Sequence, residues 1–222
     1  MEPRKLAADL FDELADATHD GIGITRASYG EGEAFAHGAV ARAAQALGLE
    51  VETDPACNTY MTLPGTDRSA APVMIGSHLD SVAEGGNFDG AAGVVAGLTA
   101  IAALRRQGAA PGRDIRVMGI RAEESAWFGT SYIGSRAALG ALPPGATESA
   151  RRADTGRTLA EHMREAGGGP GGARPPPPPP GGCWGAPPPP SPRPSCGSAA
   201  PRSPLVVRAR RDQRWSRVGS RW

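Results

Sequence analysis

Two apolar runs, separated by a helix-length segment of small residues, limit the possible folds of this chain. The first run is APVMIGSH at 71–78 and the second is DIRVMGIRAEE at 114–124, and both end in polar side chains. The segment between them, 89–107, has small packing residues and a basic end, as a helix favours. A strand, a helix and a strand in this order predict a right-handed crossover between two parallel, buried strands. The sequence therefore predicts an α/β fold with a parallel pair in its sheet.

Further elements are predicted before and after this unit. Leucines at helical spacing predict a first helix over 4–18, and a second is expected over 33–47, ended by Gly48. Short strands are predicted over 49–55 and 58–65. Two more short helices are expected over 130–139 and 157–167.

The composition changes abruptly after residue 166. From there on the chain has nine arginines and one aspartate, a net charge of +8 that leaves −7 for residues 1–166 within the total of +1. Fifteen of the 22 prolines lie between 167 and 204. Such a segment has too few apolar side chains to offset the entropy of ordering. We therefore predict a folded domain over 1–166 and a disordered Pro/Gly/Arg-rich tail over 167–222.

Cysteine usage and hydropathy argue against several classes of protein. Cys57, Cys183 and Cys196 are widely spaced, which argues against a disulfide framework and a cysteine-based zinc knuckle. No apolar run approaches the roughly 18 residues of a membrane span, and the acidic start does not resemble a signal peptide. Arginines without interleaved aromatic residues give the tail non-specific nucleic-acid affinity at best. We expect a cytoplasmic protein with no membrane partner and no specific nucleic-acid partner.

Two polar clusters follow the two predicted strands, where open α/β sheets place their sites. His78 offers an imidazole, and Asp80 is placed to orient it. Asp89 stands at a helix start, where both of its oxygens could reach metal ions. Of the adjacent acids, Glu124 can bind a metal while Glu123 acts as the general base. Together these side chains have the chemistry of a two-metal hydrolytic site.

Each pattern alone has a simpler interpretation. A lone His-x-Asp, a glutamate pair or a Gly-Gly turn is common on solvated surfaces, so only their order on one crossover favours a site. Glycines around the first cluster would let the backbone crowd close to it: Gly85, Gly86, Gly90 and Gly93. Three other histidines are interpreted as surface or core residues rather than ligands: His19, His37 and His162.

The segments GSHLDSVAEGGNFDGAAGVVAGL and RAEESAWFGTSYIGSRAALG resemble the M20-type, zinc-peptidase-like metallohydrolases. The resemblance is greatest to the branch of N-carbamoyl-L-amino acid amidohydrolases, allantoate amidohydrolases and β-ureidopropionases. The short gap from His78 to Asp89, with GGxxDG, is typical of this branch, whereas M20 peptidases have a longer insertion there. Asn58 stands where the branch usually has a Gly-Asn pair. The resemblance covers about residues 20–166 and implies a partial M20-like catalytic domain.

The resemblance also implies roles for the residues of the two clusters. His78 would bind one metal, Asp89 would bridge two metals, and Glu124 would bind the second. Glu123 would be the base, and Asp80 would support His78. The implied cofactor is Zn²⁺ or Mn²⁺, and the implied reaction is hydrolysis of the carbamoyl C–N bond of an N-carbamoyl-L-amino acid or allantoate. The partner would then be a small ureido substrate, and family members of this kind are homodimers.

The chain departs from the family after residue 166. Members have one histidine ligand in a His-Ile-Glu-Gln-Gly-type motif soon after the helix that resembles 157–167, and another near the end of the catalytic domain. Here GGGPGGARPPPPPP follows instead, and the lid and dimerisation domain is missing. We therefore expect weak metal binding and negligible turnover, and interpret the tail as a frameshift product or a truncated gene. The alternatives are a non-catalytic remnant whose proline-rich tail binds aromatic grooves, and a fragment of an M20-type peptidase or aminoacylase.

Overall fold

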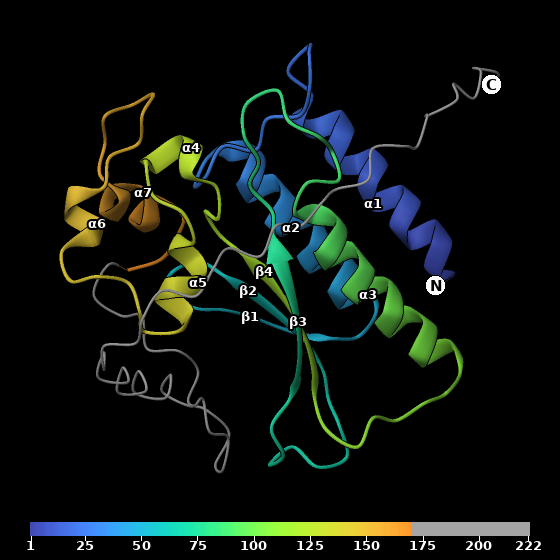
Figure 1. Cartoon of the computed structure of the whole chain (residues 1–222). Coiled ribbons are helices and arrows are strands. Elements are labelled where there is room, and N and C mark those ends of the chain that lie inside the picture. The colour runs from blue at the N-terminus through green and yellow to red at the C-terminus, as the bar shows by residue number, and fades with distance from the viewer. Residues whose placement is uncertain (170–222) are drawn as a thin grey trace, which may run out of the picture. The chain divides into compact units, whose positions relative to one another are not determined.

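The computed structural model describes residues 1–169, which form a mixed sheet with flanking helices (Figure 1). The strands are β1 (Glu50–Thr53), β2 (Thr59–Leu63), β3 (Val73–His78) and β4 (Ile115–Ile120), in the sheet order β1-β2-β4-β3. β2 pairs antiparallel with both β1 and β4, whereas β3 and β4 are parallel. The predicted α/β fold with a parallel pair is therefore confirmed.

Three long helices pack with this sheet. They are α1 (Pro3–Thr18), α2 (Glu31–Ala46) and α3 (Ala91–Arg106), and each begins and ends within two residues of its predicted range. Gly48 follows α2 with a φ of +69°, a left-handed conformation that ends a helix easily when the residue has no Cβ.

Within the described residues, four short helices follow β4. α5 (Ile133–Ala138) and α7 (Leu159–Glu165) lie within the predicted helical ranges, while α4 (Ser125–Phe128) and α6 (Ala146–Ser149) were not predicted. Helix α7 begins with a capping box, in which the Thr158 hydroxyl accepts from the backbone of Glu161 and the Glu161 carboxylate accepts from that of Thr158.

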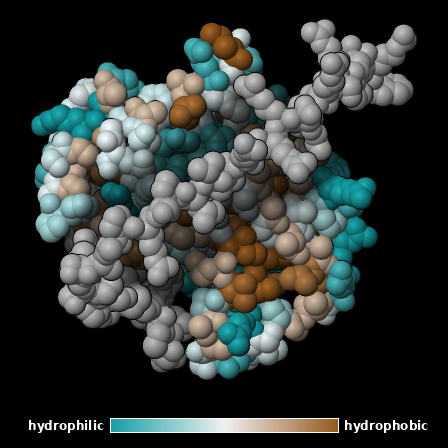
Figure 2. Space-filling model, viewed as in Figure 1, coloured by the Kyte–Doolittle hydropathy of each residue, from teal (hydrophilic) through white to brown (hydrophobic). Residues whose placement is uncertain are grey.

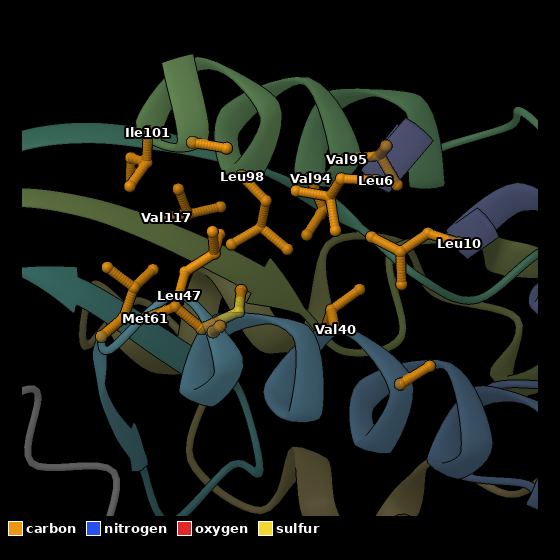
Figure 3. Close-up of a cluster of buried hydrophobic side chains, with 14 of the residues drawn as sticks. Leu6, Leu10, Val40, Leu47, Met61, Val94, Val95, Leu98, Ile101 and Val117 are labelled. Carbon is orange, nitrogen blue, oxygen red and sulfur yellow. The ribbon is translucent and has the colours of Figure 1, made fainter. Parts of the chain in front are cut away.

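The main core lies where α1, α2 and α3 meet the sheet. Figure 3 shows side chains of α2 and α3, such as Val40 and Leu98, gathered in one cluster with Met61 of β2 and Val117 of β4. The small residues of α3 allow this helix to pack close to β4, since a Cβ on Gly97 would lie 2.9 Å from Cγ2 of Val117. A second apolar cluster joins Tyr29 and Phe128 to helices α5 and α7.

The prediction of a buried first strand of the crossover is wrong. β3 pairs with β4 alone among the described strands, and Val73 and Met74 at its start are 48% and 39% exposed. Figure 2, drawn from the same side as Figure 1, shows an apolar area near β3 and α3. Hydrophobic runs indicate a strand but do not tell a central strand from an edge strand, which is the reason for the error.

The second strand of the crossover is also shorter than predicted. β4 ends at Ile120 rather than continuing toward residue 124, and Ala122 has a φ of +49°. A strand cannot continue through a residue in this left-handed conformation. The chain therefore turns immediately before the two glutamates.

None of the helices that the structure describes is long and apolar enough to cross a membrane. Beyond residue 169, the predicted tail lies outside the described residues, and so do Cys183 and Cys196. Cys57 is buried and forms no disulfide within residues 1–169.

Candidate metal centre

The parallel pairing of β3 and β4 brings the two polar clusters to one edge of the sheet. His78, the last residue of β3, lies opposite Ile120, the last residue of β4. Asp89 lies two residues before the start of α3, and Glu124 is the N-cap of α4. One donor atom from each of His78, Asp89 and Glu124 lies within 4.8 Å of the other two. The three predicted ligands therefore come together in space.

Glu123, the candidate general base, lies close to the three candidate ligands. Nε2 of His78 lies 3.7 Å from Oδ1 of Asp89 and 3.8 Å from Oε2 of Glu123. The side chain of His78 is 14% exposed, so this imidazole is mostly shielded from solvent, whereas Asp89 is 42% exposed. The arrangement leaves the carboxylates of Asp89 and Glu123 accessible to a small molecule.

The donor set fits a divalent transition metal. An imidazole with two carboxylates is a common set for Zn²⁺, and catalytic zinc usually has three protein ligands. Donor atoms bound to one ion at about 2.0–2.2 Å lie roughly 3–4 Å apart, so small side-chain movements would gather these three. Burial, followed by the charges of Asp89 and Glu123, raises the pKa of Glu124. A bound cation would offset this repulsion between carboxylates.

Asp80 lies behind the candidate ligands and is fully buried. Nδ1 of His78 is 3.0 Å from the backbone oxygen of Asp80 and 3.3 Å from its Oδ1. This contact directs Nε2 of the imidazole toward the carboxylates, as metal-binding histidines require. The Asp80 carboxylate also accepts a 2.6 Å hydrogen bond from the Ser28 hydroxyl.

Asp80 also reaches the loop after β4. Its Oδ1 accepts from the backbone N–H of Glu123 at 3.0 Å, and its Oδ2 accepts from that of Glu124 at 3.1 Å. The sequence predicted the orientation of His78 by Asp80 but not these two bonds. One buried carboxylate therefore holds both clusters in a fixed relation.

These contacts shift the pKa values of His78 and Asp80. Burial disfavours the charged form of His78, but the hydrogen bonds and charge of Asp80 and the charge of Glu123 outweigh it and raise the His78 pKa to about 9. Burial likewise opposes the ionisation of Asp80, yet hydrogen bonds from His78, Ser28 and the 123–124 backbone lower its pKa. In the metal-free chain the imidazole is therefore protonated at neutral pH.

Glycine is required at two positions near His78. Gly90 has a φ of +61°, and a Cβ there would lie 2.5 Å from Nδ1 and Cε1 of the imidazole. A Cβ on Gly93 would lie 2.5 Å from Cβ of Ser77. The predicted close approach holds for these two, but a Cβ on Gly86 would meet none of the described residues within 4 Å.

The three histidines interpreted as core or surface residues lie elsewhere. His37 is buried with Nδ1 2.8 Å from Oγ1 of Thr59, and His162 is buried with Nε2 3.2 Å from Oγ1 of Thr155. His19 is exposed, and its Nδ1 accepts from the backbone of Gly21.

One buried residue that supports the site was not predicted from the sequence. Arg26 is fully buried, and its guanidinium donates to the backbone oxygens of Leu79 at 2.7 Å and Asp89 at 3.0 Å. It therefore connects the start and the end of the loop between β3 and α3. No sequence pattern distinguishes a buried, structural arginine in a glycine-rich loop from an arginine on the surface.

Comparisons with known proteins show which families the chain resembles. The profile of Peptidase family M28 matches residues 58–147. An N-carbamoyl-L-amino acid amidohydrolase of Geobacillus stearothermophilus is 41% identical over 145 residues, which are 65% of this chain and 35% of that protein. An allantoate amidohydrolase of Bacillus subtilis is 32% identical over 174 residues, 75% of this chain and 42% of that protein.

A solved structure shows the same likeness. The hydantoinase/carbamoylase family amidase from Burkholderia ambifaria has a TM-score of 0.65 and 32% identity, over 72% of this chain and 40% of that chain. The present chain thus spans 35% to 42% of the length of these relatives. The resemblance expected from the sequence is confirmed: in sequence and in fold, this chain is similar to part of the hydantoinase/carbamoylase-type amidohydrolases.

Proposed function

We propose that this chain carries part of the catalytic centre of an M20-type, metal-dependent amidohydrolase. The substrate would be an N-carbamoyl-L-amino acid or allantoate, hydrolysed at the carbamoyl C–N bond. The convergence of His78, Asp89 and Glu124 on one point, with Glu123 beside them, carries the proposal. The names of the relatives support the choice of substrate.

In this proposal His78, through Nε2, would hold one Zn²⁺ or Mn²⁺ ion together with Asp89 and Glu124, because a donor atom of each lies within 4.8 Å of the other two. This one-ion arrangement replaces the two-metal assignment that the resemblance implies, in which Glu124 serves a second ion. When bound, the metal polarises the carbamoyl oxygen and lowers the pKa of a water. Glu123 accepts a proton from the attacking water and passes it to the leaving nitrogen. Asp80 keeps Nδ1 of His78 turned away from the ligand side. Water attack and C–N cleavage would release the amine, with ammonia and carbon dioxide from the carbamoyl group.

Metal binding tests this proposal before turnover does. His78, Asp89 and Glu124 would supply the usual three protein ligands of one ion. A second ion would have only the free carboxylate oxygens of Asp89 and Glu124 as protein ligands. We therefore expect turnover near the background rate for this chain. Zn²⁺ titration by calorimetry should give one site, and His78→Gln should weaken it at least tenfold.

A matched control separates the site from general acidity. Glu84 is an exposed acid in the same loop and lies outside the three-residue cluster. Glu84→Gln should leave the Zn²⁺ affinity within twofold of the unmodified chain. Equal affinity in the unmodified chain and His78→Gln would contradict the proposal.

A peptide substrate is the second candidate, because the matching profile is that of Peptidase family M28. The two substrates can be compared by the visible spectrum of the Co²⁺-loaded chain. An N-carbamoyl-L-amino acid should perturb the spectrum at concentrations at which a dipeptide does not. The reverse result would favour the peptidase function.

A further inference from the structure

The loop that presents the two glutamates is held by buried side-chain oxygens at four successive residues. Residues 121–124 lie outside any strand, yet each backbone N–H donates to an acceptor on a distant segment. The four bonds are Arg121 to Oδ1 of Asn58 (2.9 Å), Ala122 to Oε1 of Glu33 (2.9 Å), Glu123 to Oδ1 of Asp80 (3.0 Å) and Glu124 to Oδ2 of Asp80 (3.1 Å). This density of side-chain acceptors on a short loop indicates that its path is closely specified.

The conformation of the loop explains why such support is needed. Ala122 has a φ of +49°, a region that residues with a Cβ rarely adopt. It immediately precedes Glu123 and Glu124, so this turn sets where both carboxylates lie. Strained backbone of this kind persists only where its surroundings over-determine it.

Glu33 supplies the support at the strained residue itself. It lies in the first turn of α2 and is fully buried. Besides the Ala122 N–H, its carboxylate accepts from the backbone of Tyr29 at 2.6 Å and from Nη1 of Arg121 at 2.9 Å. A buried carboxylate is retained only when its oxygens are satisfied in this way. Both oxygens are therefore committed to donors.

We propose that Glu33 is a positioning residue for the metal centre. Its carboxylate holds residue 122 in the left-handed conformation and so fixes the approach of Glu123 and Glu124 to His78. This inference rests on the proposed function, because it assumes that these carboxylates serve a metal site. Glu33 touches neither metal nor substrate in this account and acts through the backbone.

Glu33→Gln tests the role with little change in volume. A glutamine replaces one of the two carboxylate oxygens with an NH₂ group, which cannot accept a hydrogen bond. Depending on which oxygen is replaced, the site loses either the bond from Ala122 or the bonds from Tyr29 and Arg121. We expect the Zn²⁺ affinity of the full chain, measured by calorimetry, to fall at least tenfold. A shift of the Co²⁺ spectrum should accompany the loss.

Asp114 offers a matched control at the other end of β4. It is also a buried carboxylate, and its Oδ1 accepts from the backbone of Gly65 at 2.9 Å and lies 3.2 Å from Nε of Arg68. Asp114→Asn should lower the melting temperature but keep the Zn²⁺ affinity within about threefold of wild type. Equal losses of affinity in Asp114→Asn and Glu33→Gln would overturn the positioning role.

A rescue variant separates backbone positioning from simple destabilisation. Glycine adopts a positive φ without the penalty of a Cβ. Adding Ala122→Gly to Glu33→Gln should recover most of the lost Zn²⁺ affinity, although removing the buried methyl lowers the melting temperature further. Failure of affinity to recover in the folded double variant would overturn the proposal.

Hydrogen exchange on the unmodified chain keeps the proposal testable if the variants do not fold. The amide of Ala122 should exchange at least a hundredfold more slowly than an unprotected amide, and exchange at the unprotected rate would overturn the proposal. If the unmodified chain binds no Zn²⁺, the proposed metal centre fails, and this role fails with it. If Zn²⁺ binds normally and Glu33→Gln has no effect, the positioning role alone fails.

Discussion

The backbone N–H of Glu123 donates a 3.0 Å hydrogen bond to Oδ1 of Asp80. Asp80 follows β3 and Glu123 follows β4, so this bond joins the ends of the two parallel strands. The same Oδ1 lies 3.3 Å from Nδ1 of His78. The orientation of the candidate ligand and the location of the candidate base therefore depend on one buried carboxylate.

Asp80→Asn should weaken metal binding. The asparagine keeps one acceptor but presents an NH₂ group to donors that the second oxygen now satisfies. We expect a loss of about 10–100-fold in Zn²⁺ affinity, as for other residues that orient metal ligands. Titration calorimetry measures it, with Asp67→Asn as a control at an exposed turn. Equal affinities in the two variants would contradict a role for Asp80.

Gly90→Ala should disrupt the site, whereas Gly86→Ala should not. The added methyl at Gly90 would lie 2.5 Å from the imidazole of His78, on a backbone with a φ of +61°. We expect a loss of about 2 kcal/mol or more in unfolding free energy, measured by denaturant titration, together with lost Zn²⁺ binding. At Gly86 the methyl would meet none of the described residues. Similar effects of the two changes would argue against this packing.

Zn²⁺ affinity should rise with pH until the imidazole of His78 is deprotonated. The metal binds the neutral imidazole, while the His78 pKa in the metal-free chain is about 9. Below that pH each bound ion must displace a proton, so affinity should increase about tenfold per pH unit. Competition titrations with a chelator at several pH values measure this slope. A flat profile below the His78 pKa would contradict binding through this imidazole.

The stability of the metal-free chain should change with pH in the direction opposite to its Zn²⁺ affinity. The folded-state pKa of His78 is above its ordinary value of 6.5, so protonation stabilises the metal-free fold. This contribution is complete below pH 6.5 and is lost as pH rises through about 9. The metal-free chain should therefore lose stability over this window while its Zn²⁺ affinity increases. His78→Gln should remove both trends in thermal melts and titrations.

Val73→Thr and Val117→Thr make the same change at exposed and buried positions. Val73 is 48% exposed on β3, whereas Val117 of β4 is fully buried in the main core. The buried hydroxyl should cost roughly 1–3 kcal/mol of unfolding free energy, and the exposed one should cost little. Val73→Thr should also reduce self-association seen by light scattering, because it removes apolar surface from an edge strand. Equal losses of stability would contradict the edge position of β3.

The sequence was sufficient for those elements whose pattern is local. The spacing of Leu6, Leu10 and Leu14 follows one face of α1, and all three are buried in the structure. The polar residues that end the two apolar runs likewise predicted that His78 and Glu124 would meet. Both conclusions follow from helix and strand periods and from the rule for parallel crossovers.

Properties that depend on distant partners could not be predicted in this way. Val73 belongs to an apolar run like that of β4, and only the sheet order shows that it is exposed. Glu33 resembles an ordinary acid in the first turn of a helix, and its contact with Ala122 crosses 89 positions of sequence. The tail after residue 169, and the proposed roles of the site residues, remain predictions.

The proposed function requires His78, Asp89 and Glu124 to bind one divalent metal ion. Anomalous diffraction at the zinc edge, from crystals of the chain grown with Zn²⁺, would locate the ion. We expect a peak at about 2.0–2.2 Å from Nε2 of His78 and from one carboxylate oxygen of each acid. A fully occupied zinc peak elsewhere, with these three side chains free of metal, would contradict the account.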